Sequence, residues 1–341
     1  MTDTTVRAGA SAPAAGPDFP AEFLGYFEPG SPEWHAARAD GIGGSEIAAV
    51  LGVSPHESRF SLWHRKKGLV APVEETDVMY WGKIHEPNIC AEYAKRHPDQ
   101  LVTTSGTYRA LGRPWHIANP DRLLLPVCGC GLHRPNCCDP DDCGPCCEDC
   151  PTCPTQGVRP VEVLEAKTSR DDEGWGEEYT DQIPIHYKAQ CRWYLAALGA
   201  PRCRVAVLIA GSEYREYMVE PDPVDTSLML GQGQAFIESL RDDIRPDIDG
   251  HTATYQAIRE LPEGLDDIDV EIPTALRDRF HTAQDAAWAA DDELTACKGL
   301  LLDHIGTGRR AVCERERIAT RTVRDGRTYQ LLPARTRRTA R

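Results

Sequence analysis

The chain has 341 residues, 41% of them hydrophobic, and a formal net charge of −15. This apolar content suffices for a core, and no run approaches the roughly 20 apolar residues of a membrane helix, so a membrane-spanning protein is excluded. The acidic balance argues against a uniformly basic nucleic-acid-binding surface, although one positive groove or an acidic metal site remains compatible with it.

The first 32 residues are rich in Ala, Gly, Pro, Ser and Thr and lack the apolar stretch of a secretory signal. Such a composition buries little surface and predicts a disordered leader over 1–32. Because no export signal is visible, we expect a cytoplasmic protein with reduced thiols.

Helices come next. Residues 33–52 predict two short helices separated by a glycine break, with Ser45 as the N-cap of the second. Further helices are predicted over 58–68 and over 77–96, the latter kinked at Pro87. Residues 101–125 then change to strands, with Asp121 at a strand end.

A cysteine-rich insertion occupies 127–157 and is followed by the strand VEVLEAKTS. A helix over 181–199 ends at Gly199, and the segments RCRVAVLIA and EYREYMVE predict two strands. Helices over 224–243 and 271–305 and a terminal hairpin with an Asp-Gly turn complete the chain. This order predicts a mixed fold, α/β or α+β.

The strand VEVLEAK carries an unusual pair of charges. The two-residue period of a strand places Val161, Val163, Glu165 and Lys167 on one face. Charged groups beside core valines are costly unless they are paired or bind metal. If the strand that ends at Asp121 pairs with this one, Asp121 and Glu165 converge. An ordinary ion pair on a strand is the alternative interpretation.

Converging carboxylates of this kind can hold Mg²⁺ or Mn²⁺, and Lys167 can then act on a metal-activated water or on phosphate. The helix over 181–199 adds Gln190 and Tyr194, one turn apart on the face expected to cover the sheet, together with Ile183, Tyr187 and Leu198. Glu86, in WGKIHEP, is a candidate third carboxylate or a solvated helix residue.

Six segments occur in a specific order: RADGIGGSEIAAVLGVSP, YWGKIHEP, ANPDRLL, LEAKT, IPIHYKAQCRWYLAALG and VAVLIAGSEYREY. Together, over roughly residues 33–222, they resemble the YqaJ-like viral recombinase family, which includes the phage lambda exonuclease and belongs to the PD-(D/E)xK nuclease superfamily. The resemblance implies a restriction-endonuclease-like core over 33–222, with a central mixed sheet flanked by helices. The helices and hairpin of 223–341 form a C-terminal extension.

The resemblance also implies residue roles. Asp121 and Glu165 correspond to the Mg²⁺-binding carboxylates, the carbonyl of Ala166 completes the coordination, and Glu86 is an additional carboxylate. Lys167 corresponds to the catalytic lysine, and Gln190 with Tyr194 to the Q-x-x-x-Y motif of the exonuclease branch.

Trp34, Arg38 and Ser45 fall where the family binds a 5′-phosphate. Trp34 and Arg38 lie four apart on one helical face, arginine grips phosphate in a fork, and a helix N-terminus attracts anions. A core anchor is the alternative role for Trp34.

The family implies a 5′-to-3′ exonuclease that acts on double-stranded DNA ends and leaves 3′ single-stranded tails. It also implies a single-strand annealing protein as partner, a ring-shaped homo-oligomer in some members, and the host cytoplasm as the location of a phage-encoded chain. Alternatives are an endonuclease built on the same core, and a zinc-containing DNA-binding or scaffold protein with an inactive core.

The insertion departs from the family pattern, in which a short turn joins the two strands. It contains ten candidate metal ligands: Cys128, Cys130, His133, Cys137, Cys138, Cys143, Cys146, Cys147, Cys150 and Cys153. Four ligands close one structural Zn²⁺ site, so ten suffice for two, and metal binding would supply the folding energy of a segment without apolar residues. An iron–sulfur cluster or disulfides are the alternatives.

Overall fold

A computed structural model describes residues 20–28, 30–126, 162–261, 264 and 266–334. The chain divides into two compact units, Met1–Glu263 and Gly264–Arg341, which are taken separately below. The ten candidate zinc ligands between Cys128 and Cys153 lie outside the described residues. None of the helices within the described ranges is both long enough and apolar enough to cross a membrane.

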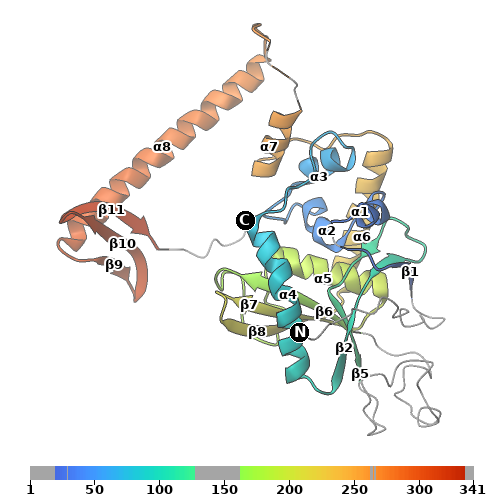
Figure 1. Cartoon of the computed structure of the whole chain (residues 1–341). Helices are drawn as coiled ribbons and strands as arrows, with labels where there is room; N and C mark the ends of the chain where they lie inside the picture. Colours follow the sequence, from blue (N-terminus) through green and yellow to red (C-terminus); the bar gives the residue numbers. More distant parts are fainter. Residues whose placement is uncertain (1–19, 29, 127–161, 262–263, 265, 335–341) are drawn as a thin grey trace, which may run out of the picture. The chain divides into compact units, whose positions relative to one another are not determined.

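The first unit is built on a mixed sheet of five strands in the order β2-β5-β6-β7-β8 (Figure 1). The β6–β7 pair is parallel and the three other pairs are antiparallel. The strands are Gln100–Thr104 (β2), Arg122–Pro126 (β5), Glu162–Ser169 (β6), Cys203–Ile209 (β7) and Glu213–Val219 (β8). The predicted mixed sheet is therefore confirmed.

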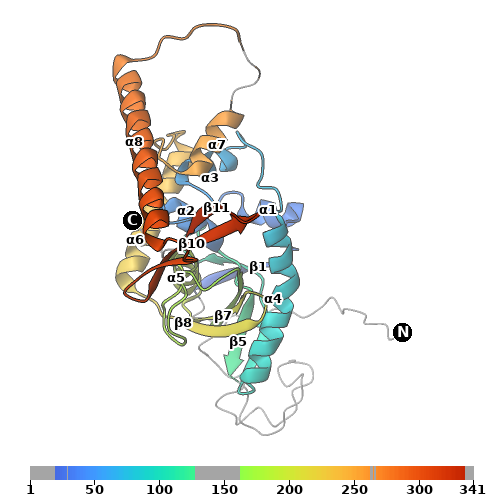
Figure 2. The ribbon, with the colours of Figure 1, turned by 90° about the vertical axis from the view of Figure 1, so that its left-hand side faces the viewer.

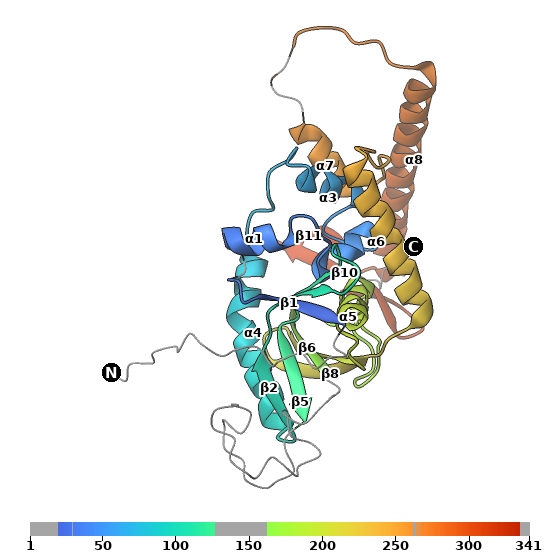
Figure 3. The same ribbon diagram turned by 90° about the vertical axis from the view of Figure 1, so that its right-hand side faces the viewer.

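Helices cover both faces of this sheet (Figures 2 and 3). Helix α4 (Asp77–Arg96) buries Ile89 and Tyr93 against the face that carries Leu164. Helix α5 (Ile185–Leu198) packs on the opposite face, with Val163 in the main core. A strand that is covered on both faces has a continuous run of apolar residues instead of an alternating pattern. Strand β7, with the sequence CRVAVLI, is of this kind.

The helix boundaries follow from local chemistry. Helix α5 begins at Ile185, after Pro184, because a proline disfavours helical backbone at the residue before it, here Ile183. Ile183, predicted on its apolar face, therefore precedes the helix, although it is buried. The helix ends at Gly199, whose φ of 63° is left-handed, as predicted. Helix α4 continues through Pro87 to Arg96.

A second sheet has the order β1-β3-β4, with strands Ala21–Gly25 (β1), Thr107–Ala110 (β3) and Ile117–Ala118 (β4). Strand β1 lies within the predicted disordered leader, so that prediction was wrong for residues 21–25. This segment is ordered by its pairing with β3, by the burial of Ala21 in the core, and by the packing of the half-buried Phe23 against that core.

The predicted continuous strand into Asp121 is also interrupted. Strand β4 belongs to the second sheet and β5 to the first, and Asn119-Pro120 lie between them. Proline has no amide hydrogen for a sheet ladder, so the chain changes sheets there. Asp121 consequently precedes β5 instead of ending the strand before it.

The described residues of the first unit form five further helices: α1 (Pro32–Arg38), α2 (Gly44–Val50), α3 (Arg59–Lys66), α6 (Pro223–Arg241) and α7 (Thr252–Glu260). The sequence predicts that α6 and α7 are part of the C-terminal extension over 223–341. In the structure both helices belong to the first unit. The reason is burial: Met229 and Phe236 of α6 enter the main core, and Thr254 of α7 donates to Ser58 at 2.6 Å.

The second unit contains a 32-residue helix, α8 (Thr274–Ile305), and a sheet of β9 (Arg310–Cys313), β10 (Glu316–Arg324) and β11 (Arg327–Pro333). The predicted Asp-Gly hairpin is confirmed, because Asp325 and Gly326 both have positive φ between β10 and β11. Strand β9 adds an unpredicted third strand. A small core of Ala311, Ala319 and Leu331 contacts the end of α8.

Candidate active site

Strand pairing brings the predicted carboxylates together. Strands β5 and β6 pair antiparallel with Arg122 opposite Leu164, so Asp121, one residue earlier, is level with Glu165, one residue later. The backbone N–H of Ala166 donates to Oδ2 of Asp121 at 2.8 Å and fixes that carboxylate. This register confirms the prediction that Asp121 and Glu165 lie side by side.

Glu165 is the centre of the cluster and is 1% exposed. Its Oε1 accepts from Nζ of Lys167 at 2.6 Å and from Nε2 of Gln190, also at 2.6 Å. Its Oε2 is buried, and in the described part of the chain it has no hydrogen-bond partner. A buried carboxylate oxygen without a donor is costly, and a bound cation satisfies it.

Helix α5 contributes the rest of this face. Nε2 of Gln190 also donates to the hydroxyl of Tyr194 at 2.9 Å, and the ring of Tyr187 lies under Lys167, with 5.0 Å from Nζ to its centroid. The helical spacing of Tyr187, Gln190 and Tyr194 thus correctly predicts that they lie on one face of α5. Tyr194 also packs on Gly44: a Cβ there would lie 2.3 Å from Cε1 of the ring.

The electrostatics of the cluster are dominated by burial. Burial and the charge of Glu165 raise the pKa of Asp121 to about 7. Burial likewise raises the pKa of Glu165, against the opposing charge of Lys167. Burial lowers the pKa of Lys167, but the carboxylates of Glu165 and Asp121 outweigh burial and raise that pKa well above its usual value. Two acids and one permanent cation leave an excess of negative charge suited to a metal ion.

The predicted third carboxylate, Glu86, is paired with an arginine in this structure. Its Oε1 accepts from Nη1 of Arg122 at 2.8 Å, an ion pair between α4 and the first residue of β5. Throughout the described ranges, no three His, Cys, Asp or Glu side chains gather closely enough to ligate one metal ion. Mg²⁺ is commonly held by one or two carboxylates together with waters, so Asp121 and Glu165 fit such an ion without Glu86.

The predicted phosphate residues are only partly brought together. The guanidinium of Arg38 lies 4.1 Å above the ring of Trp34, and its Nη1 donates to Oδ1 of Asn119 at 3.2 Å. Asn119 lies two residues before Asp121. Ser45 is exposed and is the second residue of α2, whose N-cap is Gly43, so the predicted N-cap was wrong. The side-chain contact at this helix start comes from Glu46 instead, whose Oε2 accepts from the Gly43 amide at 2.8 Å.

A second buried charge cluster was missed by the sequence analysis. Glu46, 6% exposed, pairs with Arg65 and Lys66 of α3, each at 3.1 Å, and with Arg38 at 3.8 Å. Arg65 also binds Glu57 at 2.8 Å. Burial raises the pKa of Glu46, but the charges of Lys66, Arg38 and Arg65 outweigh burial and lower it to about 2. The signal available in the sequence was the basic end of α3.

Comparison with known proteins finds a relative by sequence and solved structures that resemble this chain. The chain is 24% identical over 259 residues to the uncharacterized protein YqaJ of Bacillus subtilis (strain 168), covering 73% of this chain and 69% of that protein. It is similar to the crystal structure of an alkaline exonuclease from Laribacter hongkongensis, with a TM-score of 0.44 and 17% identity over 63% of this chain and 94% of the other. A phage related exonuclease from Haemophilus somnus 129PT gives a TM-score of 0.36 and 8% identity, covering 65% and 96%.

The family comparison covers the part of the chain that holds the cluster. The description that matches is "YqaJ-like viral recombinase domain", over residues 33–201, which include every described candidate residue from Trp34 to Tyr194. Residues 33–201 of this chain are therefore a YqaJ-like viral recombinase domain.

Proposed function

We propose that this chain is a Mg²⁺-dependent deoxyribonuclease that degrades linear double-stranded DNA from its ends. The proposed polarity is 5′ to 3′, and the product is a 3′ single-stranded tail for an annealing partner in recombination. The observation that carries the proposal is the buried convergence of Asp121, Glu165 and Lys167, in which one carboxylate oxygen of Glu165 has no partner among the described residues.

Asp121, Glu165 and the carbonyl of Ala166 would hold the ion; Mn²⁺ could replace Mg²⁺. When bound, such an ion polarises a phosphodiester and lowers the pKa of a coordinated water. Lys167 keeps one N–H on Glu165 and has two further donors, which can orient the attacking water and offset charge on the phosphate. Gln190 holds Oε1 of Glu165 in place, and Tyr194 supports Gln190. Burial keeps the pKa of the Tyr194 hydroxyl well above its usual value, so Tyr194 acts as a neutral group.

Recognition of a DNA end is assigned to Arg38, with Trp34 and Ser45. Arg38 stacks on Trp34 and donates to Asn119, which lies two residues before Asp121 in the chain. A 5′-phosphate bound there would lie near the reacting phosphodiester. Arg38 is 8% exposed, so a phosphate must approach the part of its fork that Glu46 and Asn119 leave free.

The test is digestion of linear duplex DNA in Mg²⁺, with and without a 5′-phosphate and with label at either end. We expect release of nucleotides from the 5′ label first and faster digestion of phosphorylated ends. Covalently closed circles should remain intact. Equal nicking of closed circles would favour an endonuclease on the same site, and absence of any cleavage would favour an inactive core with a binding or scaffold role.

Zinc in the cysteine-rich segment is a separate proposal that rests on the sequence. Cys128 to Cys153 contain nine cysteines and His133, enough for two Zn²⁺ sites. Metal analysis of the purified full chain tests it: zinc is expected at one or two equivalents. Iron with visible absorbance and no zinc would replace this proposal by an iron–sulfur cluster.

A further inference from the structure

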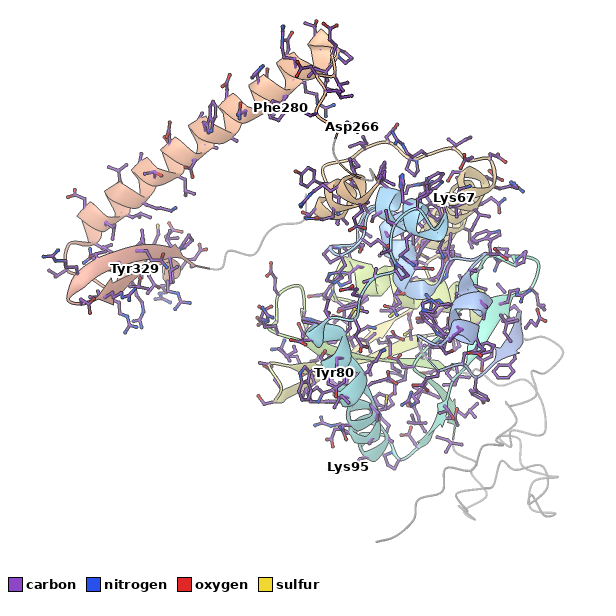
Figure 4. The ribbon with its side chains drawn as sticks, turned by 45° about the horizontal axis from the view of Figure 1, so that its top comes forward. Lys67, Tyr80, Lys95, Asp266, Phe280 and Tyr329 are labelled. Carbon is purple, nitrogen blue, oxygen red and sulfur yellow. The ribbon has the colours of Figure 1, made fainter. Side chains whose placement is uncertain are left out.

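The long helix α8 carries an apolar stripe that the described residues of the second unit leave largely uncovered. No residue of α8 is buried, and Leu276, Phe280 and Leu294 are 51%, 62% and 47% exposed. Figure 4 labels Phe280 near the start of this helix. An amphipathic helix gains most of its stability from packing of its apolar face, so an uncovered stripe over this length indicates a missing partner.

The spacing of the stripe identifies the kind of partner. Apolar residues recur alternately three and four positions apart, which is the heptad pattern of a coiled coil. The series is Leu276, Phe280, Ala283, Ala287, Ala290, Leu294, Cys297 and Leu301. Among the described residues of the second unit, the covering is at the end of the stripe, where Leu301 packs against the core of β9, β10 and β11. The free part therefore runs from the start of α8 to about Cys297.

We propose that this stripe binds the same stripe of a second copy of the chain, in an antiparallel coiled coil. In the register that places Ala283 of each copy opposite Ala287 of the other, Phe280 lies opposite Ala290 and Leu276 opposite Leu294. Phe280, the largest residue of the stripe, then meets the small Ala290, as close packing between helices requires. The paired segment ends where Leu301 begins to contact its own sheet.

Charges beside the stripe select the same register. In an antiparallel pair, residues that flank the stripe on one side face the same positions of the other copy. Arg277 then faces Asp291 of the second copy, and Arg279 faces Glu293 of the second copy, so two-fold symmetry makes four ion pairs. In the described part of the single chain, Arg277 pairs with the adjacent, exposed Asp278 at 2.7 Å.

A parallel pair of the same helices is less complementary. Each residue of the stripe would face its own copy, so Phe280 would meet Phe280 and Ala287 would meet Ala287. Arg279 would face the uncharged Gln284 of the second copy. The large ring of Phe280 and the charges of the two arginines are both matched in the antiparallel arrangement and not in the parallel one.

The experiment reverses the charges in the full-length chain. The variant Arg277→Glu with Arg279→Glu, and the variant Asp291→Lys with Glu293→Lys, each place like charges opposite one another in a self-pair. We expect each to weaken self-association at least about tenfold, as judged from the concentration dependence of sedimentation. An equimolar mixture of the two variants should restore association, because every facing pair is then complementary.

The matched control is Asp285→Lys with Asp292→Lys, two reversals of the same sign on the opposite face of α8, which should associate like the unchanged chain. Any association through the first unit contributes equally to all samples. Rescue in the mixture also establishes that both variants fold. The inference is overturned if the mixture does not associate, if neither variant is weakened, or if the control is weakened equally.

Discussion

The first unit contains two buried charge clusters with opposite electrostatics. Around Glu46, three cations satisfy one carboxylate and lower its pKa to about 2. Around Glu165, two carboxylates share one lysine, and burial raises the pKa of Asp121 to about 7. The first cluster is complete within the protein, whereas the second has a carboxylate oxygen left over. Surplus negative charge, rather than burial of charge, therefore distinguishes the candidate site from a structural ion network.

The largest expected effect is on catalysis. Lys167→Ala should reduce the rate of duplex digestion by roughly 10³-fold, because a positioned cation acts on the charge that develops at the phosphate. Lys188→Ala is the matched control, since Lys188 lies on α5 and pairs with Asp181 at 3.0 Å. Rates on labelled linear DNA measure both. Full activity of Lys167→Ala, with unchanged folding by circular dichroism, would remove the lysine from the proposed site.

The Glu46 cluster should respond in stability. Glu46→Gln leaves Arg38, Arg65 and Lys66 without their shared acceptor and should lower the free energy of unfolding by about 3 kcal/mol. Urea unfolding measures this loss. Glu57→Gln, which removes only the outer partner of Arg65, should cost less than half as much. Equal losses would mean that the cluster is not centred on Glu46.

The same cluster predicts a dependence on acid. The pKa of Glu46 is about 2 in the folded chain and 4.5 as its ordinary value, so the unfolded chain binds the proton more readily between these values. The stabilisation by Glu46 is thus complete above about pH 4.5 and is lost as the pH falls towards 2. Unfolding midpoints from pH 6 to 3 should converge for the unchanged chain and Glu46→Gln. A constant gap between the two would contradict this assignment.

The candidate site should show the opposite sign. Because the folded-state pKa of Asp121 is raised from 3.8 to about 7, its ionisation opposes folding as the pH rises through that window. In chelator at pH 8, Asp121→Asn should therefore raise the free energy of unfolding by about 1 kcal/mol while abolishing cleavage. Added Mg²⁺ should stabilise the unchanged chain only. Destabilisation by Asp121→Asn in chelator would contradict the surplus of negative charge.

The smallest expected effect is at Ser45. Because Ser45 is exposed on α2 and is not its N-cap, Ser45→Ala should change the free energy of unfolding by less than about 0.5 kcal/mol. If Ser45 contacts a 5′-phosphate, the ratio of rates on phosphorylated and unphosphorylated ends should fall about threefold. An unchanged ratio would leave end recognition to Arg38 and Trp34.

How far the sequence predicts this site depends on how local each signal is. Glu165 with Lys167, and Gln190 with Tyr194, follow from the periods of one strand and one helix. The strand boundary beside Asp121 was placed wrongly, because residues 101–125 read as one strand system and the sheet change at Asn119-Pro120 depends on tertiary pairing. The partners of Glu46 come from α1 and α3, and no periodic pattern links residues so far apart.

The origin of the proposed catalytic side chains has a practical consequence. Glu165, Lys167, Gln190 and Tyr194 all lie on one continuous strand–helix–strand segment, β6-α5-β7, and only Asp121 comes from elsewhere. A chain opened between β5 and β6 would carry four of the five groups on a single fragment. The complementary fragment would return Asp121 through one antiparallel pairing, so this protein is suited to division into two inactive halves that regain activity on reassembly.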